Sequence, residues 1–184
     1  MKLLFRELTI DDIPAIKEIS KDIWEGEDYV PQVIENWLKD ENCMNYGAFK
    51  DKERREMVGF GRVKLFNKEL AWLEGGRVKV DYQKKGIGRD MIKYALDYAK
   101  SVNAKKAQYD TSSKNLGSIA LAKYFGFKRK KSMNVLDAKR SDINIIKSPP
   151  LEVKTVSAEE AKELYKDFDI GPGDEINMGW SYKS

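Results

Sequence analysis

The stretch that most constrains the fold of this chain is residues 78–90. It starts with the alternating apolar residues of a strand, passes through a turn with two lysines and two glycines, and opens a helix expected over 86–100. The first N–H groups of a helix lack intrahelical partners, and with the helix dipole they attract anions. Gly86 and Gly88 would let an anion come close to the backbone. The stretch therefore predicts a strand–turn–helix unit that binds a phosphate group.

Three phosphate-binding motifs can be compared with this turn. The GK[ST] of a P-loop is absent, and a dinucleotide fingerprint would need glycine where Met91 stands. The pattern that remains is Q-x-x-G-x-G over 83–88, which resembles the pyrophosphate-binding motif of the GNAT superfamily of acyl-CoA-dependent N-acyltransferases. On these six residues alone, an ordinary strand–turn–helix with a glycine-rich joint stays open as an alternative.

Composition narrows the function classes. Of the 184 residues, 41% are apolar and 35% are charged, as in a soluble globular domain. The net charge of +4 suits an anionic ligand but is too small for a nucleic-acid-binding surface. Cys43 is the single cysteine, which favours a reducing, cytoplasmic location, and no run is long enough to span a membrane. The chain has no histidine, so we expect no histidine base and no metal site.

The order of expected elements predicts an α+β fold, with a mixed β-sheet flanked by helices and a parallel crossover at its centre. Gly75 and Gly76 predict a bulge in one strand. Expected strands cover 3–8, 45–50, 57–65, 69–80, 107–111 and 127–136, and expected helices begin at 9–12 and cover 33–38, 86–100 and 115–125.

A second motif, at 115–127, looks like the GNAT helix motif N-x-x-A-x-x-L-Y-x-x-x-G-F, and it follows the first in the right element. The resemblance covers about residues 3–136. It implies a GNAT acetyltransferase domain at 1–137, followed by a linker at 138–150 and a C-terminal extension at 151–184. That extension has an expected strand at 151–156 and a capping box at 157–160, so a lid and a partial second GNAT-like unit stay open.

The resemblance implies acetyl-CoA as co-substrate, with the pyrophosphate at the glycine turn and the pantetheine arm along the strand before it. The cofactor-binding residues that it implies are Val78, Lys79, Val80, Gln83, Lys84, Lys85, Gly86, Ile87, Gly88, Arg89, Asn115 and Ser118.

Two positions depart from the family pattern. Val80 replaces a proline, and Ala122 replaces the tyrosine that commonly protonates the leaving thiolate. Tyr124 is two residues further along the expected helix, which turns it away from the cofactor side, so we expect a core or interface tyrosine there. Ser118, a water molecule or direct departure of the thiolate would then replace the acid.

An amine must lose a proton to attack a thioester, so the site needs a base. Without histidine a carboxylate is the natural candidate, and family members often place a glutamate base on the strand that leads into the turn. Glu74 occupies that strand beside the expected bulge. A solvent-facing strand glutamate is the alternative. Cys43 is interpreted as structural or incidental rather than as a nucleophile.

The loop between the first two helices lines the acceptor pocket in this superfamily. The residues with which it would hold a cationic amine, through carboxylates and aromatic faces, are Trp24, Glu25, Glu27, Asp28 and Tyr29. The alternative is a solvated turn with Trp24 buried. Residues 23–31 and 73–75 also resemble a GNAT branch that includes histidine N-acetyltransferase, which suggests a free amino acid or a similar small amine as acceptor.

The sequence therefore favours an N-acetyltransferase that transfers the acetyl group of acetyl-CoA directly to a small-molecule amine. A non-catalytic acyl-CoA-binding regulatory module is the alternative, supported by Ala122. We expect no nucleic-acid or membrane partner, and the sequence leaves open whether the protein is a homodimer.

Overall fold

The computed structural model describes residues 2–50, 56–67 and 69–132, together with Thr155, Ser157, Glu159, Glu160 and Glu163. The chain divides into two compact units, Met1–Lys128 and Arg129–Ser184, which are described separately. In the part of the chain described, no helix combines the length and apolar character needed to cross a membrane.

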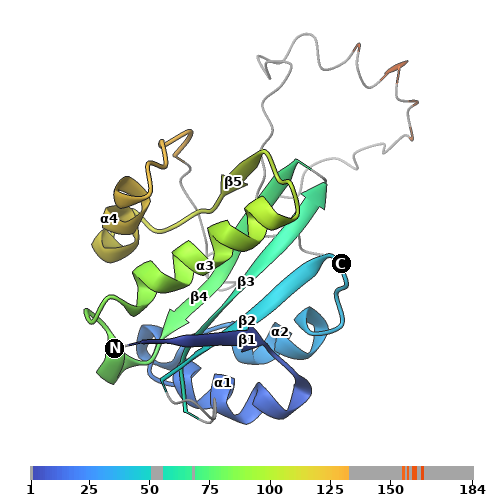
Figure 1. Ribbon diagram of the computed structural model, residues 1–184. Coiled ribbons are helices and arrows are strands. Elements are labelled where there is room, and N and C mark those ends of the chain that lie inside the picture. Colours follow the sequence, from blue (N-terminus) through green and yellow to red (C-terminus); the bar gives the residue numbers. More distant parts are fainter. Residues whose placement is uncertain are drawn as a thin grey trace, which may run out of the picture. The chain divides into compact units, whose positions relative to one another are not determined.

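The first unit is built on a mixed sheet whose strands lie in sequence order (Figure 1). Its strands are β1 (Leu4–Glu7), β2 (Cys43–Phe49), β3 (Met57–Asn67), β4 (Leu70–Val78) and β5 (Lys106–Gln108). Neighbouring strands from β1 to β4 are antiparallel, and β4 and β5 are parallel, as a helical crossover between them requires. The predicted α+β fold with a mixed sheet is confirmed, but the parallel pair lies at the edge of the described sheet rather than at its centre, because β5 is the last strand in the order.

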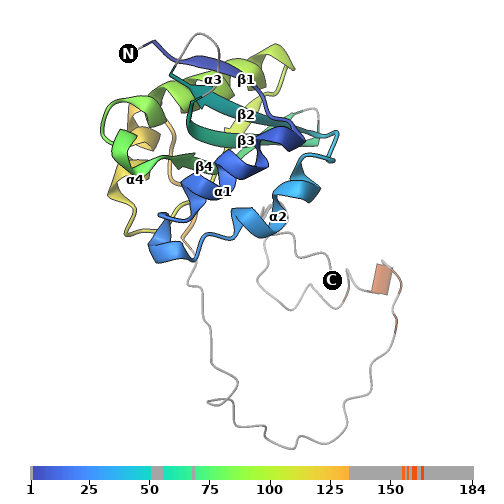
Figure 2. The ribbon, with the colours of Figure 1, turned by 90° about the horizontal axis from the view of Figure 1, so that it is seen from below.

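Helices cover both faces of the sheet (Figure 2). On one face, α3 (Ile87–Ser101) packs Met91, Ala95 and Ala99 against inward residues of β2, β3 and β4. On the other face, α1 (Ile13–Ser20) and α2 (Val30–Trp37) pack Ile16, Ile34 and their neighbours against the opposite side of the strands. Side chains that alternate along the strands therefore contribute to two separate cores, one on each face of the sheet.

The expected bulge lies in β4. Phe60 pairs with Arg77 and Arg62 with Glu74, so one residue of β3 faces two of β4. Gly75 has φ of 65°, and a Cβ there would lie 2.6 Å from Cζ3 of Trp37. Only glycine fits this position, because it tolerates the left-handed backbone and the close aromatic ring. The bulge thus fixes how β4 carries Glu74 on one side and Arg77 on the other.

Other expected segments differ or lie outside the described residues. Phe127–Ser132 contains no strand, and 133–136 is outside the described part, so the expected strand over 127–136 is not formed where it can be followed. The charged residues 51–56 predict a hairpin turn between the strands expected over 45–50 and 57–65, and all of them but Glu56 lie outside the described part. Nearly all of the expected strand over 151–156 and the domain boundaries at 137 and 150 also lie outside it. The capping box is present in the second unit: Ser157 N donates to Glu160 Oε2 at 2.8 Å, and Glu160 N donates to Ser157 Oγ at 3.2 Å.

Candidate active site

The anion turn, residues 83–89, connects β4 to α3 through the short 3-10 turn Val80–Tyr82. Two of its residues have a left-handed backbone conformation: Lys84 has φ of 58° and Gly86 has φ of 85°. Gln83 Nε2 donates to the carbonyl of Val78 at 3.2 Å and ties the turn to the end of the strand. Within α3 the N–H of Arg89 donates to Gly86 O at 3.0 Å, so an anion at the start of the helix would have to use the N–H groups before Arg89.

The charges of the anion turn are exposed, whereas Ile87 is only 2% exposed and can offer a ligand little but its backbone. Lys84, Lys85 and Arg89 all face solvent, and Lys85 Nζ lies 5.2 Å from the ring centre of Tyr82. A Cβ on Gly88 would lie 3.3 Å from Cδ1 of Leu121, so this glycine also admits a neighbouring helix. The missing side chain of Gly88 therefore lets Leu121 pack close to the backbone, and it would let a ligand approach in the same way.

Near the anion turn, one edge of β4 is not paired with another described strand. Only Leu70–Trp72 pair with β5, while the strand continues to Val78 with hydrogen bonds to β3 alone within the described residues. An extended ligand can lie along such an edge by adding backbone hydrogen bonds. Of the groups expected to contact the pantetheine arm, the N–H of Lys79 is engaged, because it donates to Val58 O at 2.9 Å.

The helix α4 (Leu116–Tyr124) begins at Asn115, whose side chain accepts a hydrogen bond from Ser118 N at 3.0 Å. Asn115 thus has a capping role within the described structure. Tyr124 is 68% exposed, so the expectation of a core position is wrong, since the α4 face that carries it is not covered by the rest of the described unit.

Glu74 lies across from Arg62 in the β3–β4 register. Its Oε1 is 3.1 Å from Nη1 of Arg62, and only 13% of its side chain is exposed, so it is not a solvent-facing glutamate. Burial is the largest influence on the pKa of Glu74 and raises it, while the charges of Arg62 and Lys64 lower it; the net pKa is raised. A raised pKa is the direction that a base working on an ammonium needs.

Arg62 also contacts groups beyond β4, which together form the Arg62 cluster: Asp40, Cys43, Arg62 and Glu74. Nη2 of Arg62 lies 2.7 Å from Asp40 Oδ2 and 2.6 Å from Cys43 Sγ. Burial and the hydrogen bond to Asp40 raise the pKa of Cys43 to about 12. The thiol therefore stays protonated near neutral pH, which argues against a nucleophilic role.

The acceptor loop, residues 24–29, has a tightly bent backbone. Trp24, Glu25 and Gly26 have φ of 49°, 59° and 91°, three left-handed residues in succession. Asp28 anchors the loop, because its Oδ2 and Oδ1 accept hydrogen bonds from Nε and Nη2 of Arg77 at 3.0 and 2.8 Å. Both side chains are buried, so the Asp28 carboxylate is already neutralised and does not face an acceptor.

The aromatic residues of the loop surround the same arginine. The guanidinium of Arg77 lies 4.3 Å from the ring centre of Trp24 and 5.5 Å from that of Tyr29. Trp24 is 55% exposed, so the alternative of a buried Trp24 is wrong. Glu25 and Glu27 remain as the exposed acids of the loop.

The sequence interpretation did not identify Arg62, Arg77 or Trp37 as part of the site. Trp37 lies under Arg62, with 4.6 Å between its ring centre and the guanidinium carbon, and Tyr29 stands edge-on to it at 6.0 Å. The sequence contains a signal for the two arginines: each lies between a glycine and a valine in a largely apolar strand, and a buried charge needs a partner.

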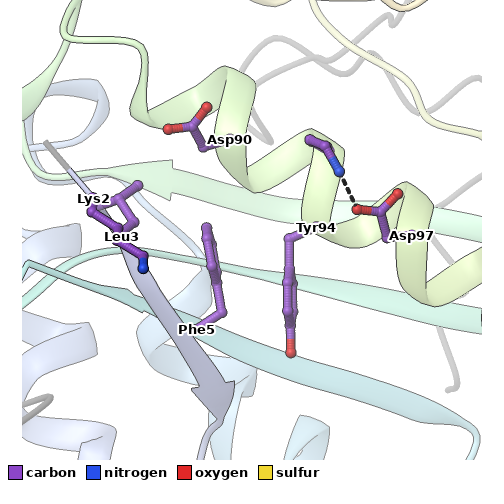
Figure 3. Close-up of a pocket in the computed structure, with 7 residues that line it drawn as sticks. Lys2, Leu3, Phe5, Asp90, Tyr94 and Asp97 are labelled. Atoms are coloured by element: carbon purple, nitrogen blue, oxygen red, sulfur yellow. Dashed lines mark hydrogen bonds and ion pairs between the residues drawn. The ribbon is translucent and has the colours of Figure 1, made fainter. Parts of the chain in front are cut away.

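A surface hollow of about 300 Å³ lies elsewhere, between β1 and α3 (Figure 3). Phe5 and Tyr94 stack across it with ring centres 4.5 Å apart, and its rim carries Lys2, Asp90, Lys93 and Asp97. None of the residues expected to bind donor or acceptor lines it, so volume alone does not mark the candidate site.

Comparison with known proteins agrees with this geometry. A model described as the acetyltransferase (GNAT) family matches residues 13–127. No curated protein matches the chain.

Several solved structures share the fold. A transcriptional regulator from Bacillus halodurans C-125 is 21% identical with a TM-score of 0.62, covering 74% of this chain and 100% of its own. The ribosomal-protein-S18-alanine N-acetyltransferase from Escherichia coli is 19% identical with a TM-score of 0.62, covering 71% and 80%. An aminoglycoside N-acetyltransferase in complex with the bisubstrate analogue CoA-S-monomethyl-acetylneamine is 15% identical with a TM-score of 0.61, covering 76% and 99%.

At these identities the solved structures show the fold alone. The family model, in contrast, spans more than half of the sequence and includes the anion turn, β4 and α4. The chain belongs to the acetyltransferase (GNAT) family.

Proposed function

We propose that the protein transfers the acetyl group of acetyl-CoA directly to an amine of a small molecule such as an amino acid, within a ternary complex. Membership of the GNAT family supports an acyltransferase. The observation that carries the proposal is the course of β4, which carries the largely buried Glu74 and ends at Val78, one 3-10 turn before the anion turn.

The donor is proposed to bind along β4. Its pyrophosphate would lie at the N–H groups of the anion turn, with Lys84, Lys85 and Arg89 adding positive charge. The pantetheine arm would follow the edge that β5 leaves open. Asn115 and Ser118, at the start of α4, would border the donor on the side of that edge.

Glu74 is proposed to act as the base. The amine nitrogen attacks the thioester carbonyl carbon, a nitrogen–carbon bond forms, and Glu74 accepts the amine proton directly or through one water. The carbon–sulfur bond then breaks, and its electron pair leaves with the CoA sulfur. A thiol pKa of about 8.5 makes this thiolate a tolerable leaving group. Departure without a dedicated acid is therefore compatible with Ala122 at the position of the family's tyrosine.

The acceptor loop is proposed to hold the amine. Glu25 and Glu27 would supply exposed negative charge, and Trp24 and Tyr29, whose rings already contact the Arg77 guanidinium, would border the amine with aromatic surface. Asp28 contributes by anchoring the loop to Arg77 rather than by touching the acceptor. This arrangement favours a cationic small-molecule amine.

A non-catalytic acyl-CoA-binding regulatory module is the second candidate. Ala122 favours it, because the residue that often protonates the leaving thiolate is absent from α4.

One assay separates the two functions. The purified protein is supplied with acetyl-CoA and a panel of free amino acids and small amines, and both the released thiol and the acetylated product are measured. The proposal predicts product in amounts equal to the thiol and only when an amine is present. Tight binding of acetyl-CoA by calorimetry, with no acetylated product from any amine, would instead support the regulatory module.

A further inference from the structure

The buried contacts around Arg62 give Glu74 an unusual partner. Arg62 is 4% exposed, in the middle of β3, and its ion pair with Glu74 places Nη1 at 3.1 Å from Glu74 Oε1. The other ion pair on β4 is different, because Arg77 grips Asp28 with two hydrogen bonds of 3.0 and 2.8 Å. Bidentate geometry is the stronger form of an arginine–carboxylate pair. Glu74 is thus the more weakly held of the two carboxylates.

The remaining nitrogens of Arg62 explain why its hold on Glu74 is weak. Nη2 is turned toward Asp40 at 2.7 Å and toward Cys43 Sγ at 2.6 Å, and the guanidinium rests on the ring of Trp37. Nε is buried and has no hydrogen-bond partner among the described residues. A buried donor without a partner is unfavourable, so packing and the contacts of Nη2 fix the orientation of Arg62 at the expense of Nε.

We propose that Asp40 and Arg62 act as positioning residues for Glu74, with Asp40 holding the guanidinium so that Glu74 is oriented by its ion pair with Nη1 of Arg62 while receiving only part of the positive charge. This inference rests on the proposed function of Glu74 as base. A carboxylate gripped by a whole arginine would be a weak base, whereas an unpaired buried one would be protonated near neutral pH. Sharing one cation between two carboxylates avoids both extremes.

Other charged and titratable groups also face Glu74. Those that influence it or are influenced by it are Arg62 and Lys64 from β3, Asp40 after α2, Asp110 after β5, and Tyr29 before α2. Lys64 lies 4.0 Å from Asp40 Oδ2, so it offsets the negative charge of Asp40 more directly than that of Glu74. Asp110 and Asp40 both raise the pKa of Glu74, and Asp40 in addition lies 2.7 Å from Nη2 of Arg62.

The two partners of Glu74 should have opposite effects. Asp40→Asn frees Arg62 to give more of its charge to Glu74, so the pKa of Glu74 should fall. Arg62→Met leaves a buried carboxylate without its cation, so that pKa should rise. Asp40 has 28% of its side chain exposed, which makes Asp40→Asn a mild substitution that the fold should tolerate. If Asp40 and Arg62 only supported folding, their substitutions would not shift the pKa of Glu74 in opposite directions.

The test is a carbon-13 NMR titration of the Glu74 carboxyl group in the ligand-free protein, with the signal assigned by its loss in Glu74→Gln. We expect Asp40→Asn to lower the Glu74 pKa by about 0.5 to 1 unit, and Glu41→Gln, a control that removes the exposed charge next to Asp40 in sequence, to lower it by clearly less. Equal shifts in both variants, or no shift in Asp40→Asn, would overturn the inference, whether or not Arg62→Met folds. The acidic limb of the pH profile of kcat/KM tests the proposed function separately: it should move with the NMR value if Glu74 is the base.

Discussion

The anion turn and the Arg62 cluster show two ways to build a functional region on the same strand. The anion turn consists of contiguous residues, and two of them, Lys84 and Gly86, have left-handed backbone conformations. Its charged side chains face solvent. The Arg62 cluster takes its residues from β2, β3, β4 and the segment after α2, and its central charge is buried. The first region depends on local backbone geometry, and the second depends on packing. Substitutions should therefore affect ligand binding in the first and stability or chemistry in the second.

The largest expected effect concerns buried charge. Arg77→Leu leaves the buried Asp28 carboxylate without its cation, and removing one partner of a buried pair costs about 3–5 kcal/mol. Arg89→Leu, the control in the exposed anion turn, should change the free energy of unfolding by about 0.5 kcal/mol or less. Urea denaturation of both variants measures the difference, and a loss below about 1 kcal/mol in Arg77→Leu would remove the distinction between buried and exposed charge.

The bulge offers a paired test of the packing. Gly75→Ala forces a side chain into a left-handed backbone and against Trp37, so we expect about 2 kcal/mol of destabilisation or more. Gly76→Ala is the control next to it in sequence, since a Cβ there meets nothing within 4 Å, and it should be nearly neutral. Thermal unfolding of the two variants compares their stabilities. Equal stability would mean that a side chain at position 75 can be accommodated beside Trp37 without cost.

A smaller effect is expected in the anion turn. Gly88→Asp and Gly88→Asn crowd Leu121 alike, but only the first adds negative charge at the start of α3. We expect acetyl-CoA affinity to be about 2- to 30-fold weaker in Gly88→Asp than in Gly88→Asn, with a ratio that shrinks as salt rises. Calorimetric affinities that are the same for both variants would place the pyrophosphate elsewhere.

The smallest effect is expected at Tyr124. Because this side chain is 68% exposed and two residues past Ala122, Tyr124→Phe should leave kcat within about twofold. Steady-state turnover with the best amine provides the measurement. A fall of about 10²-fold, typical of a lost proton-transfer group, would make Tyr124 the acid after all.

Much of the fold could be predicted because it follows from local pattern. The apolar spacing of α3, the glycines of the bulge and the capping residue Asn115 each act within a few residues of their position. The end of the sheet was harder, because β5 pairs over only three residues and the expected strand after it depends on long-range pairing.

The candidate site divides in the same way. The anion turn could be read from the sequence, since a backbone motif is contiguous. The Arg77–Asp28 pair joins residues 49 apart in sequence, and the contact between Arg62 and Asp40 joins residues 22 apart. No local pattern specifies such partners, so Asp28 was assigned to the acceptor although the structure gives its charge to Arg77. Buried charges acquire their role from what surrounds them.

The most direct test of the account is the effect of Glu74→Gln on two quantities measured in the same preparation, kcat and the affinity for acetyl-CoA. The variant keeps the size of the side chain but cannot accept a proton. We predict that kcat at neutral pH falls by about 10²-fold while the Kd of acetyl-CoA stays unchanged. Wild-type activity should decline as pH drops through the raised pKa of Glu74, and the variant should lack this limb. Normal turnover by Glu74→Gln would contradict the assignment of Glu74 as base.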